Sequence, residues 1–315
     1  MRTTTLGSTN IPASQLCLGA MYFGTRTDEA TSFRLLDTYI DAGGFFIDTA
    51  NIYSRWVPGF KGYESECLLG RWMKARKNRS NMLIATKVGF EIPEYGVERG
   101  LPETTIVQEC EKSLRNLGVE TIDLYYAHCD DPNTPLEETL GAFDQLVKAG
   151  KVRAIGASNY QAWRLEEALW VSQTHGWSEF CSVQQRYTYL RPGPGQSFFP
   201  QVAVNDDLRE YCRRRPVTLL AYAALLAGAY TRVDRQFPGQ YRGPDADARL
   251  AALRAMAVEK NITMNQVVLA WMLNSNPFVL PLIAASSEEQ LKENIQALDI
   301  SLSPDEMKFL DEAGC

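Results

Sequence analysis

The sequence predicts an α/β protein, a (β/α)8 barrel with an N-terminal β-hairpin and extra helices near the C-terminus. Apolar strand-like runs alternate with amphipathic helical segments along all 315 residues. Regular alternation of this kind indicates parallel strands joined by crossover helices. Eight such units without a composition break favour one closed barrel, and we expect residues 1–315 to form a single domain.

An open, doubly wound sheet is the alternative arrangement. A dinucleotide site in such a sheet has a G-x-G-x-x-G motif directly after its first strand. The first strand predicted here runs into Gly19-Ala20-Met21-Tyr22-Phe23-Gly24, which does not have that spacing. The barrel is therefore the favoured prediction.

The strands are predicted from runs that are apolar throughout, as is typical of parallel strands buried on both faces. Residues 1–14 precede them as a short hairpin, with Gly7-Ser8-Thr9-Asn10 as its turn. The eight barrel strands are expected at residues 16–21, the run ending at Asp48, 82–88, 122–128, 152–158, 180–187, 218–225 and 279–285.

The helices are predicted from apolar residues at helical spacing and from their end signals. Asp28 is a typical N-cap, Pro102 a typical first helical residue, and glycines such as Gly118 typically follow a last turn. Helices are expected at residues 28–43, 64–77, 102–118, 136–150, 161–173, 203–215, 247–260, 264–274 and 287–298, with a short one from 304.

The two longest connections, residues 190–202 and 226–246, each follow a strand. In a barrel they lie on the face that carries active sites. Both are rich in glycine, proline and aromatic residues. Whether they act as lids or only elaborate the fold stays open at this stage.

Composition excludes several classes of protein. A net charge of −6 gives no basic footprint for nucleic acid or an anionic membrane. There is no apolar run of about 18 residues and no apolar segment of a signal peptide at the amino end. The seven cysteines are scattered without a C-x-x-C pair, as in a reducing compartment. We expect a cytoplasmic protein with a small-molecule partner; the sequence does not define its oligomeric state.

Residues that carry chemistry follow three successive strands. Asp48, Lys87 and His128 each stand at the end of a predicted strand, and Tyr53 lies five positions beyond Asp48. The carboxyl ends of barrel strands meet at one mouth, so these side chains are expected to converge. A carboxylate buried there requires a cation, and Lys87 can supply it.

This convergence predicts acid–base chemistry on a carbonyl group. The Lys87 ammonium is expected to lower the pKa of the Tyr53 phenol from about 10, so that it donates a proton to a developing alkoxide. His128 can hold the carbonyl oxygen or relay the proton. Taken singly, each residue also has a structural explanation, such as a cap or a buried hydroxyl. A metal site is disfavoured because one histidine without clustered acids or cysteines is no ligand set.

Several linked motifs, in order, resemble those of the aldo-keto reductase superfamily. They are Phe46-Ile47-Asp48-Thr49-Ala50 with Tyr53, Ser113-Leu114-x-x-Leu117-Gly118 followed by Ile122-Asp123-Leu124-Tyr125-Tyr126-x-His128, and Gly150-Lys151-Val152-Arg153-x-Ile155-Gly156-x-Ser158-Asn159. The resemblance covers nearly the whole chain. It implies a barrel that binds a nicotinamide dinucleotide without a Rossmann fold. It also implies a tetrad in which Tyr53 is the acid, Asp48 and Lys87 tune it, and His128 orients the substrate.

The resemblance implies NADPH as cofactor, with NADH as an alternative. Ser158, Asn159 and Gln184 would bind the carboxamide, Tyr222 would stack on the nicotinamide, and the segment from Ala284 would bind the adenosine. The full set of implied cofactor-binding residues is Ala20, Met21, Asp48, Ser158, Asn159, Gln184, Tyr222, Ala223, Leu225, Gly228, Ala284, Ser286, Gln290, Glu293 and Asn294.

The cofactor segments also depart from the common family pattern. Tyr222-Ala223-Ala224-Leu225 stands where an aromatic residue followed by Ser-Pro-Leu is common, which removes one hydroxyl contact. Residues 284–294 contain no arginine to hold a 2′-phosphate, and Ala285-Ser286-Ser287 with Gln290 resembles the branch with potassium-channel β-subunits and bacterial oxidoreductases. We therefore expect a modest preference for NADPH.

The sequence thus predicts an NADPH-dependent reductase of aldehyde, ketone or sugar carbonyls. Tyr22, Phe23, Trp56 and Tyr187 are expected to frame its substrate pocket. One alternative is a redox sensor that holds the cofactor, turns over poorly and signals to a partner. Another is an aldolase in which Lys87 forms a Schiff base, although that chemistry leaves Tyr53 unexplained.

Overall fold

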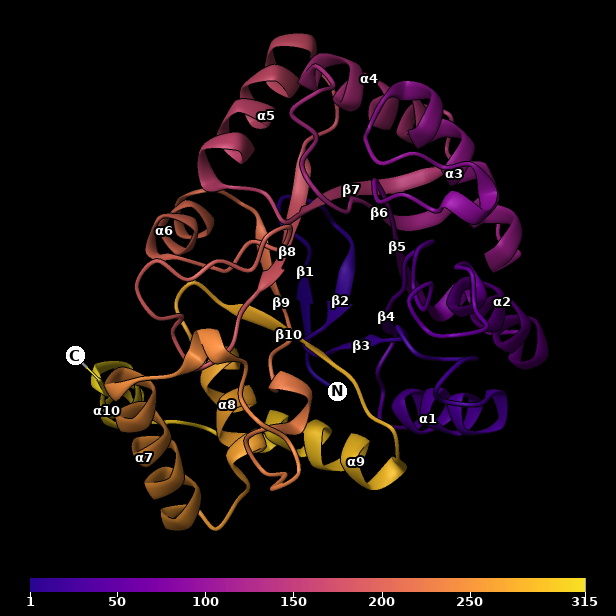
Figure 1. Ribbon diagram of the computed structural model, residues 1–315. Helices are drawn as coiled ribbons and strands as arrows, with labels where there is room; N and C mark the ends of the chain where they lie inside the picture. Colours follow the sequence, from indigo (N-terminus) through magenta and orange to yellow (C-terminus); the bar gives the residue numbers. More distant parts are fainter. Residues whose placement is uncertain (315) are drawn as a thin grey trace.

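A computed structural model describes residues 1–314 and has a closed barrel of eight strands at its centre (Figure 1). Each strand pairs in parallel with both neighbours, in the order β10-β3-β4-β5-β6-β7-β8-β9. The predicted barrel is confirmed, and the open-sheet alternative is wrong. The strands are β3 Cys17–Gly19, β4 Phe46–Asp48, β5 Leu83–Val88, β6 Ile122–Ala127, β7 Val152–Ser158, β8 Phe180–Arg186, β9 Thr218–Tyr222 and β10 Val279–Ile283.

The predicted N-terminal hairpin closes one end of the barrel. Its antiparallel strands are β1 Thr3–Thr5 and β2 Pro12–Ser14, which appear inside the ring of barrel strands in Figure 1. Leu6, Ile11 and Ala13 are buried in one apolar cluster with inward-facing residues of the barrel, among them Leu124 and Leu280. Because the hairpin plugs this end, a ligand has access to the barrel from the other end, where the strands finish.

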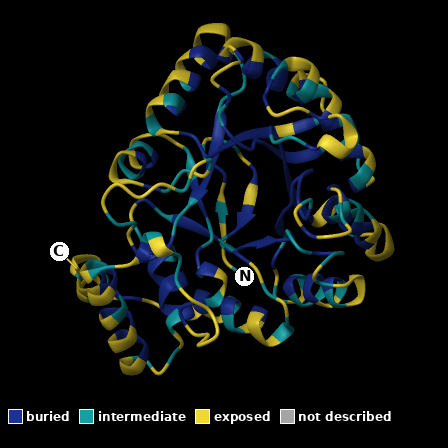
Figure 2. Ribbon diagram, viewed as in Figure 1, coloured by how far each residue is buried: buried dark blue, intermediate teal, exposed yellow. Residues whose placement is uncertain are grey.

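The helices surround the barrel and bury their inner faces, while their outer faces are exposed (Figure 2). The α-helices are α1 Glu29–Asp41, α2 Glu64–Arg76, α3 Glu103–Leu117, α4 Leu136–Lys148, α5 Ala162–His175, α6 Asp206–Arg214, α7 Pro244–Glu259, α8 Met264–Leu273, α9 Glu288–Gln296 and α10 Pro304–Glu312. Short 3-10 turns occur at η1 Arg79–Asn81, η2 Pro93–Tyr95, η3 Leu226–Gly228, η4 Gly239–Tyr241 and η5 Ala297–Asp299.

Most predicted end signals act as expected. The Asp28 side chain accepts a hydrogen bond from the Thr31 amide at the start of α1, and Gly118 ends α3 with a φ of 64°. Several boundaries differ by two or three residues, and two of them have a clear local cause. Strand β9 ends at Tyr222, short of the predicted residue 225, because the backbone turns into the left-handed region at Ala223, with a φ of 56°. Helix α7 begins at residue 244, where a proline occupies the first helical position.

Side chains alternate along each strand between the barrel interior and the layer beneath the helices. On β6, Leu124 and Tyr126 belong to the interior cluster, whereas Tyr125 and Ala127 pack in the outer layer with the helices. Both faces are therefore apolar, which is why the strands have no alternating polar pattern in the sequence. The uppermost inward positions are polar, and they form the site described below. Within residues 1–314, no helix has the length and apolar character needed to span a membrane.

Candidate active site

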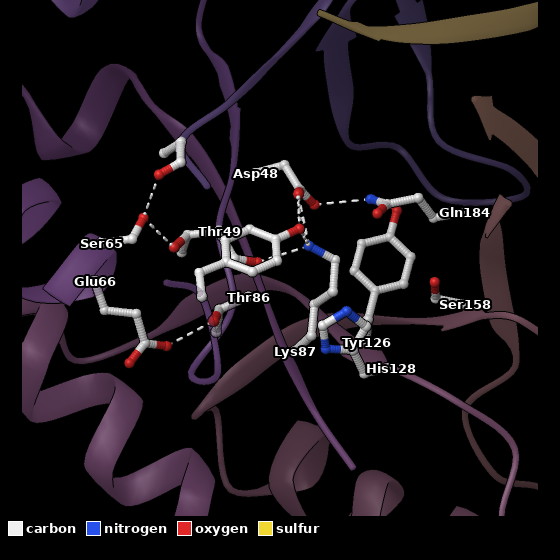
Figure 3. A network of polar contacts seen from close by, with 12 residues as sticks. Asp48, Thr49, Ser65, Glu66, Thr86, Lys87, Tyr126, His128, Ser158 and Gln184 are labelled. Carbon is white, nitrogen blue, oxygen red and sulfur yellow. Dashed lines mark hydrogen bonds and ion pairs between the residues drawn. The ribbon is translucent and has the colours of Figure 1, made fainter. Parts of the chain in front are cut away.

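Three of the four predicted catalytic residues stand at the ends of adjacent strands. Asp48 is the last residue of β4, Lys87 lies near the end of β5, and His128 directly follows β6. Tyr53 comes from the turns between β4 and α2. The Lys87 ammonium donates to Asp48 Oδ2 at 2.6 Å, to the Tyr53 hydroxyl at 2.7 Å and to the Thr49 carbonyl at 2.7 Å (Figure 3). The structure thus brings the charged pair and the phenol together.

The Asp48 carboxylate is fully hydrogen-bonded and fully buried. Besides Lys87, it accepts from the Tyr53 hydroxyl at 3.1 Å and from Gln184 Nε2, on β8, at 2.8 Å (Figure 3). A buried ion pair is stable only when its remaining lone pairs are satisfied, and this arrangement meets that condition. Asp48 therefore fixes both Lys87 and Gln184 in place.

The protonation of Tyr53 and Lys87 follows from this burial. Desolvation raises the pKa of Tyr53 well above its usual value, and the neighbouring Asp48 carboxylate raises it further. Our expectation that Lys87 lowers the Tyr53 pKa is wrong in sign for this arrangement, because burial and Asp48 outweigh the ammonium. Burial also lowers the pKa of Lys87, although Asp48 opposes that shift. The phenol is accordingly protonated at neutral pH.

His128 lies beside Tyr53 with a neutral imidazole. Its ring makes edge contacts with Tyr53 and Phe90, at centroid distances of 6.0 and 4.8 Å. Desolvation, with a smaller effect of the Lys87 charge, lowers the pKa of His128 well below 6.5. Among the described residues its buried Nδ1 has no hydrogen-bond partner. An unpartnered buried ring nitrogen beside a proton donor indicates a position for a polar ligand atom.

A cavity of about 1140 Å³ extends from this point in both directions. Its volume exceeds the roughly 300–1000 Å³ of common ligand pockets, which leaves room for two molecules. It is lined by all but two of the predicted cofactor-binding residues, namely Met21, Ser158, Asn159, Gln184, Tyr222, Ala223, Leu225, Gly228, Ala284, Ser286, Gln290, Glu293 and Asn294. The predicted substrate residues Tyr22, Phe23 and Trp56 line its other end.

Four predicted site residues do not line this cavity: Ala20, Asp48, Lys87 and Tyr187. Ala20 is buried and bonds through its backbone to Ser65 and Asp48, while Asp48 lies beneath Lys87, Tyr53 and Gln184. Tyr187 packs against Trp271 of α8, with ring centroids 5.6 Å apart. It lines a neighbouring cavity together with Arg186 and Phe198, which also line this one, so the role of Tyr187 as a substrate residue stays a prediction.

Several residues that were not named as candidates line the same cavity. They are Arg55, Glu91, Phe90, Arg186, Arg232 and the segment 198–201. Arg186 could have been found from the strand, since it follows Gln184 by two positions and so faces the same way. Arg232 and the segment 198–201 lie in the two long loops that were expected on this face. The others come from loops, whose path is not encoded by a periodic pattern.

The polar groups of the cavity fit a nicotinamide dinucleotide. At the end near Tyr53, the Asn159 amide donates to the His128 carbonyl at 2.9 Å, and the Tyr222 hydroxyl donates to Asn159 Oδ1 at 2.6 Å. At the far end, Ser287 is the N-cap of α9, so the amino end of a helix faces the region of Ser286 and Gln290. Donors thus stand at both ends of the cavity, with the unpartnered His128 nitrogen between the cofactor and substrate ends.

A Schiff base at Lys87 is disfavoured by the same geometry. The ammonium is fully buried, all three of its protons are engaged, and it does not line the cavity. A carbonyl carbon therefore cannot reach Lys87 without breaking the Asp48 pair. In the described part of the chain, no group of three or more metal-ligating side chains is present either.

Residues 15–314 match the Aldo/keto reductase family. The chain belongs to this family. Norsolorinic acid reductase stcV of Emericella nidulans is 32% identical over 96% of this chain and 78% of its own length. The oxidoreductase YrpG of Bacillus subtilis is 32% identical over 99% of this chain and 95% of its own length.

A solved member of the family has the same fold. The thermostable aldo-keto reductase Tm1743, in complex with the inhibitor epalrestat, superposes with a TM-score of 0.77 at 29% identity, and 99% of each chain is covered. The aldo-keto reductase described here is accordingly an oxidoreductase of that family. The resemblance stated from the sequence motifs is confirmed.

Proposed function

We propose that this aldo-keto reductase uses NADPH to reduce the carbonyl group of aldehydes and ketones, with aryl carbonyl compounds as its main substrates. One observation carries the proposal: a protonated Tyr53 phenol is held by Lys87 and Asp48 next to His128, at the base of a cavity large enough for cofactor and substrate. A positioned acid of this kind is what carbonyl reduction needs.

When bound, a nicotinamide would supply the hydride. The protein's own residues hold and donate the proton. Tyr53 donates its proton to the developing alkoxide as the general acid. The Lys87 ammonium, 2.7 Å away, stabilises the phenolate that remains. Asp48 holds Lys87 in position, and neutral His128 donates a hydrogen bond to the carbonyl oxygen.

Two observations support NADPH over NADH. Ser286 and Gln290 line the adenosine end, near the amino end of α9, and offer neutral donors for a phosphate. Arg232, from the loop after β9, pairs with Asp234, lines the same cavity and supplies the guanidinium that residues 284–294 lack. The relative aryl-alcohol dehydrogenase [NADP(+)] of Phanerodontia chrysosporium, 30% identical over 95% of this chain and 82% of its own length, is named for this coenzyme.

The shape of the substrate end supports aryl compounds. Trp56 lies edge-on to both Tyr22 and Tyr53, at centroid distances of 6.4 and 6.5 Å, and Phe90 stands against His128. A carbonyl at Tyr53 would place its attached ring among these aromatic faces, where offset or edge contacts are favourable. The relatives named as norsolorinic acid reductase and aryl-alcohol dehydrogenase agree with a ring-bearing substrate.

NADPH oxidation by the purified protein tests the proposal. The panel is a benzaldehyde, an aryl ketone, cyclohexanecarbaldehyde and a keto-sugar, and we expect the highest kcat/KM with the aryl carbonyls. Firm NADPH binding, followed by fluorescence, without turnover of any compound would favour the redox sensor instead. Absence of NADPH binding would contradict both functions.

A further inference from the structure

The mouth of the cavity beyond His128 combines aromatic rings with arginines. Three of the rings that line it carry a guanidinium group on one face. The guanidinium carbons of Arg26, Arg99 and Arg186 lie 4.7, 5.2 and 4.4 Å from the ring centroids of Tyr22, Phe90 and Phe198. Each guanidinium makes a cation–π contact with the face of its ring. The mouth therefore gathers several cations in a protein whose net charge is −6.

A fourth arginine, Arg55, lines the cavity itself and directly precedes Trp56. Its guanidinium contacts the Glu91 carboxylate through one nitrogen at 3.3 Å. That is longer than the roughly 2.7–2.9 Å of a strong charge-assisted hydrogen bond, and such half-exposed pairs are weak. Arg55 therefore has donors left for a second anion.

The backbone holds Arg55 and Trp56 in position. The preceding residue, Ser54, is buried and has a φ of 70°, which a non-glycine residue adopts only when its surroundings impose it. The Ser54 hydroxyl donates to the Met21 carbonyl at 2.8 Å, and the Arg55 amide donates to the Ile52 carbonyl at 3.1 Å. A side chain presented on a fixed turn binds at a lower entropic cost than one on a mobile loop.

Few acids line the cavity beside Arg55 and Arg186. Of the described residues that line the cavity, two are acidic, Glu91 and Glu293. Glu293 lies at the adenosine end and accepts a hydrogen bond from Thr263. Glu91 is therefore the one carboxylate that competes at the substrate end.

We propose that Arg55 binds an anionic substituent, a carboxylate or an ionised phenol, on an aryl carbonyl substrate whose ring lies against Trp56. The inference rests on the proposed function and names the substrate class of the same site. Trp56, which is 48% exposed, supplies the apolar face, and Arg55 beside it supplies the charge. A planar arginine fork suits a carboxylate better than a lysine does.

Matched aldehydes at saturating NADPH test the inference. The 3- and 4-carboxybenzaldehydes carry the charge, and the 3- and 4-methylbenzaldehydes are neutral analogues of similar size. For at least one isomer we expect kcat/KM to favour the carboxylate by about tenfold or more, as for a hydrogen-bonded ion. The preference should shrink when ionic strength rises, because the mouth is open to solvent.

Two variants at the pair should shift this ratio in opposite directions, which a purely structural role would not do. Arg55→Met should remove the preference for the carboxylate, and Glu91→Gln should increase it. Arg71→Met is the matched control: Arg71 pairs with Glu29 on α2 and α1 and does not line this cavity, so the ratio should stay as in the unaltered protein.

The outcomes separate this inference from the proposed function. Equal kcat/KM for charged and neutral aldehydes, or a preference that survives Arg55→Met, overturns the role of Arg55 while reduction of aryl carbonyls stands. Failure to reduce either aldehyde, together with no binding of NADPH, overturns both. A preference that is lost in Arg55→Met and enhanced in Glu91→Gln supports the inference.

Discussion

The base of the cavity and its mouth are built in different ways. At the base, Asp48 and Lys87 are fully buried on strands, and every charged atom has a partner within hydrogen-bond distance. At the mouth, Trp56 and Phe199 are 48% and 83% exposed and stand on loops. At the base, every charged group has its hydrogen-bond partners within the protein. At the mouth, aromatic faces are exposed and Arg55 has donors left for a ligand.

The difference separates chemistry from selectivity. Strands joined to a closed barrel cannot shift singly, so residues on their ends keep the geometry that proton transfer needs. Loops tolerate change without loss of the barrel, so the mouth can be adapted to a substrate. Substitutions at the base should therefore change kcat for every carbonyl compound, and those at the mouth should change the ranking of compounds.

Lys87→Met should have the largest effect. It removes the cation from both Tyr53 and Asp48, so we expect kcat to fall by about 10³-fold or more, at least as far as for loss of the phenol. Leaving Asp48 buried without its partner should also lower the free energy of unfolding by roughly 3–5 kcal/mol. Steady-state kinetics and urea unfolding measure the two effects. Lys308→Met, at an exposed pair with Glu312, is the control, and a normal kcat for Lys87→Met would contradict the assignment.

Tyr53→Phe should come next. The ring contacts remain but the proton donor is lost, so kcat should fall by roughly 10²–10⁴. The dissociation constant of NADPH should stay nearly unchanged, because the phenol bonds to Lys87 and Asp48 at the base of the cavity. Tyr95→Phe is a suitable control, since Tyr95 is half-exposed and outside the cavity. A kcat within a few-fold of normal would show that another group donates the proton.

Coenzyme choice should show a smaller effect. Replacing Arg232 by Met removes a cation from the adenosine end and should lower the NADPH-to-NADH ratio of kcat/KM by about tenfold. Arg235→Met, on the same loop but not lining the cavity, should leave the ratio unchanged. Ser287→Arg should raise it, at the cost of the α9 N-cap. A tenfold advantage for NADH in the unaltered protein would contradict our reading of this segment.

The contrast between base and mouth also explains what the sequence could predict. Local patterns were enough to predict the order of the strands, the hairpin and the positions of Asp48, Lys87 and His128. The end of each apolar run marks the end of a strand, and the carboxyl ends of barrel strands meet at one mouth. Tyr53 could be placed because it lies five residues from Asp48 in a turn that folds back.

Two features of the site could not be derived from local patterns. The pKa of Tyr53 depends on how burial and Asp48 balance against Lys87, and that balance is set by depth in the folded protein. The second feature is the mouth, where Arg55, Glu91, Arg99 and Phe199 come from three loops. Nothing periodic in the sequence places Arg99 within 6.0 Å of the Phe199 ring centroid.

The smallest expected effect concerns the protonation of His128, which joins the two regions, and it appears in the pH dependence of stability. Its pKa in the folded protein is well below the unfolded value of about 6.5, because burial disfavours the charged imidazole. Well above pH 6.5 the His128 imidazole is neutral in both the folded and the unfolded protein, so its burial lowers stability by nothing that depends on pH. Below pH 6.5 the unfolded chain binds a proton that the folded protein does not, so stability falls by up to about 1.4 kcal/mol per pH unit.

Urea unfolding between pH 7.5 and about 5.5 should show a shallower loss of stability for His128→Gln than for the unaltered protein. His175→Gln, at the exposed end of α5, should keep the original slope, and equal slopes for all three proteins would show that His128 charges freely in the folded state.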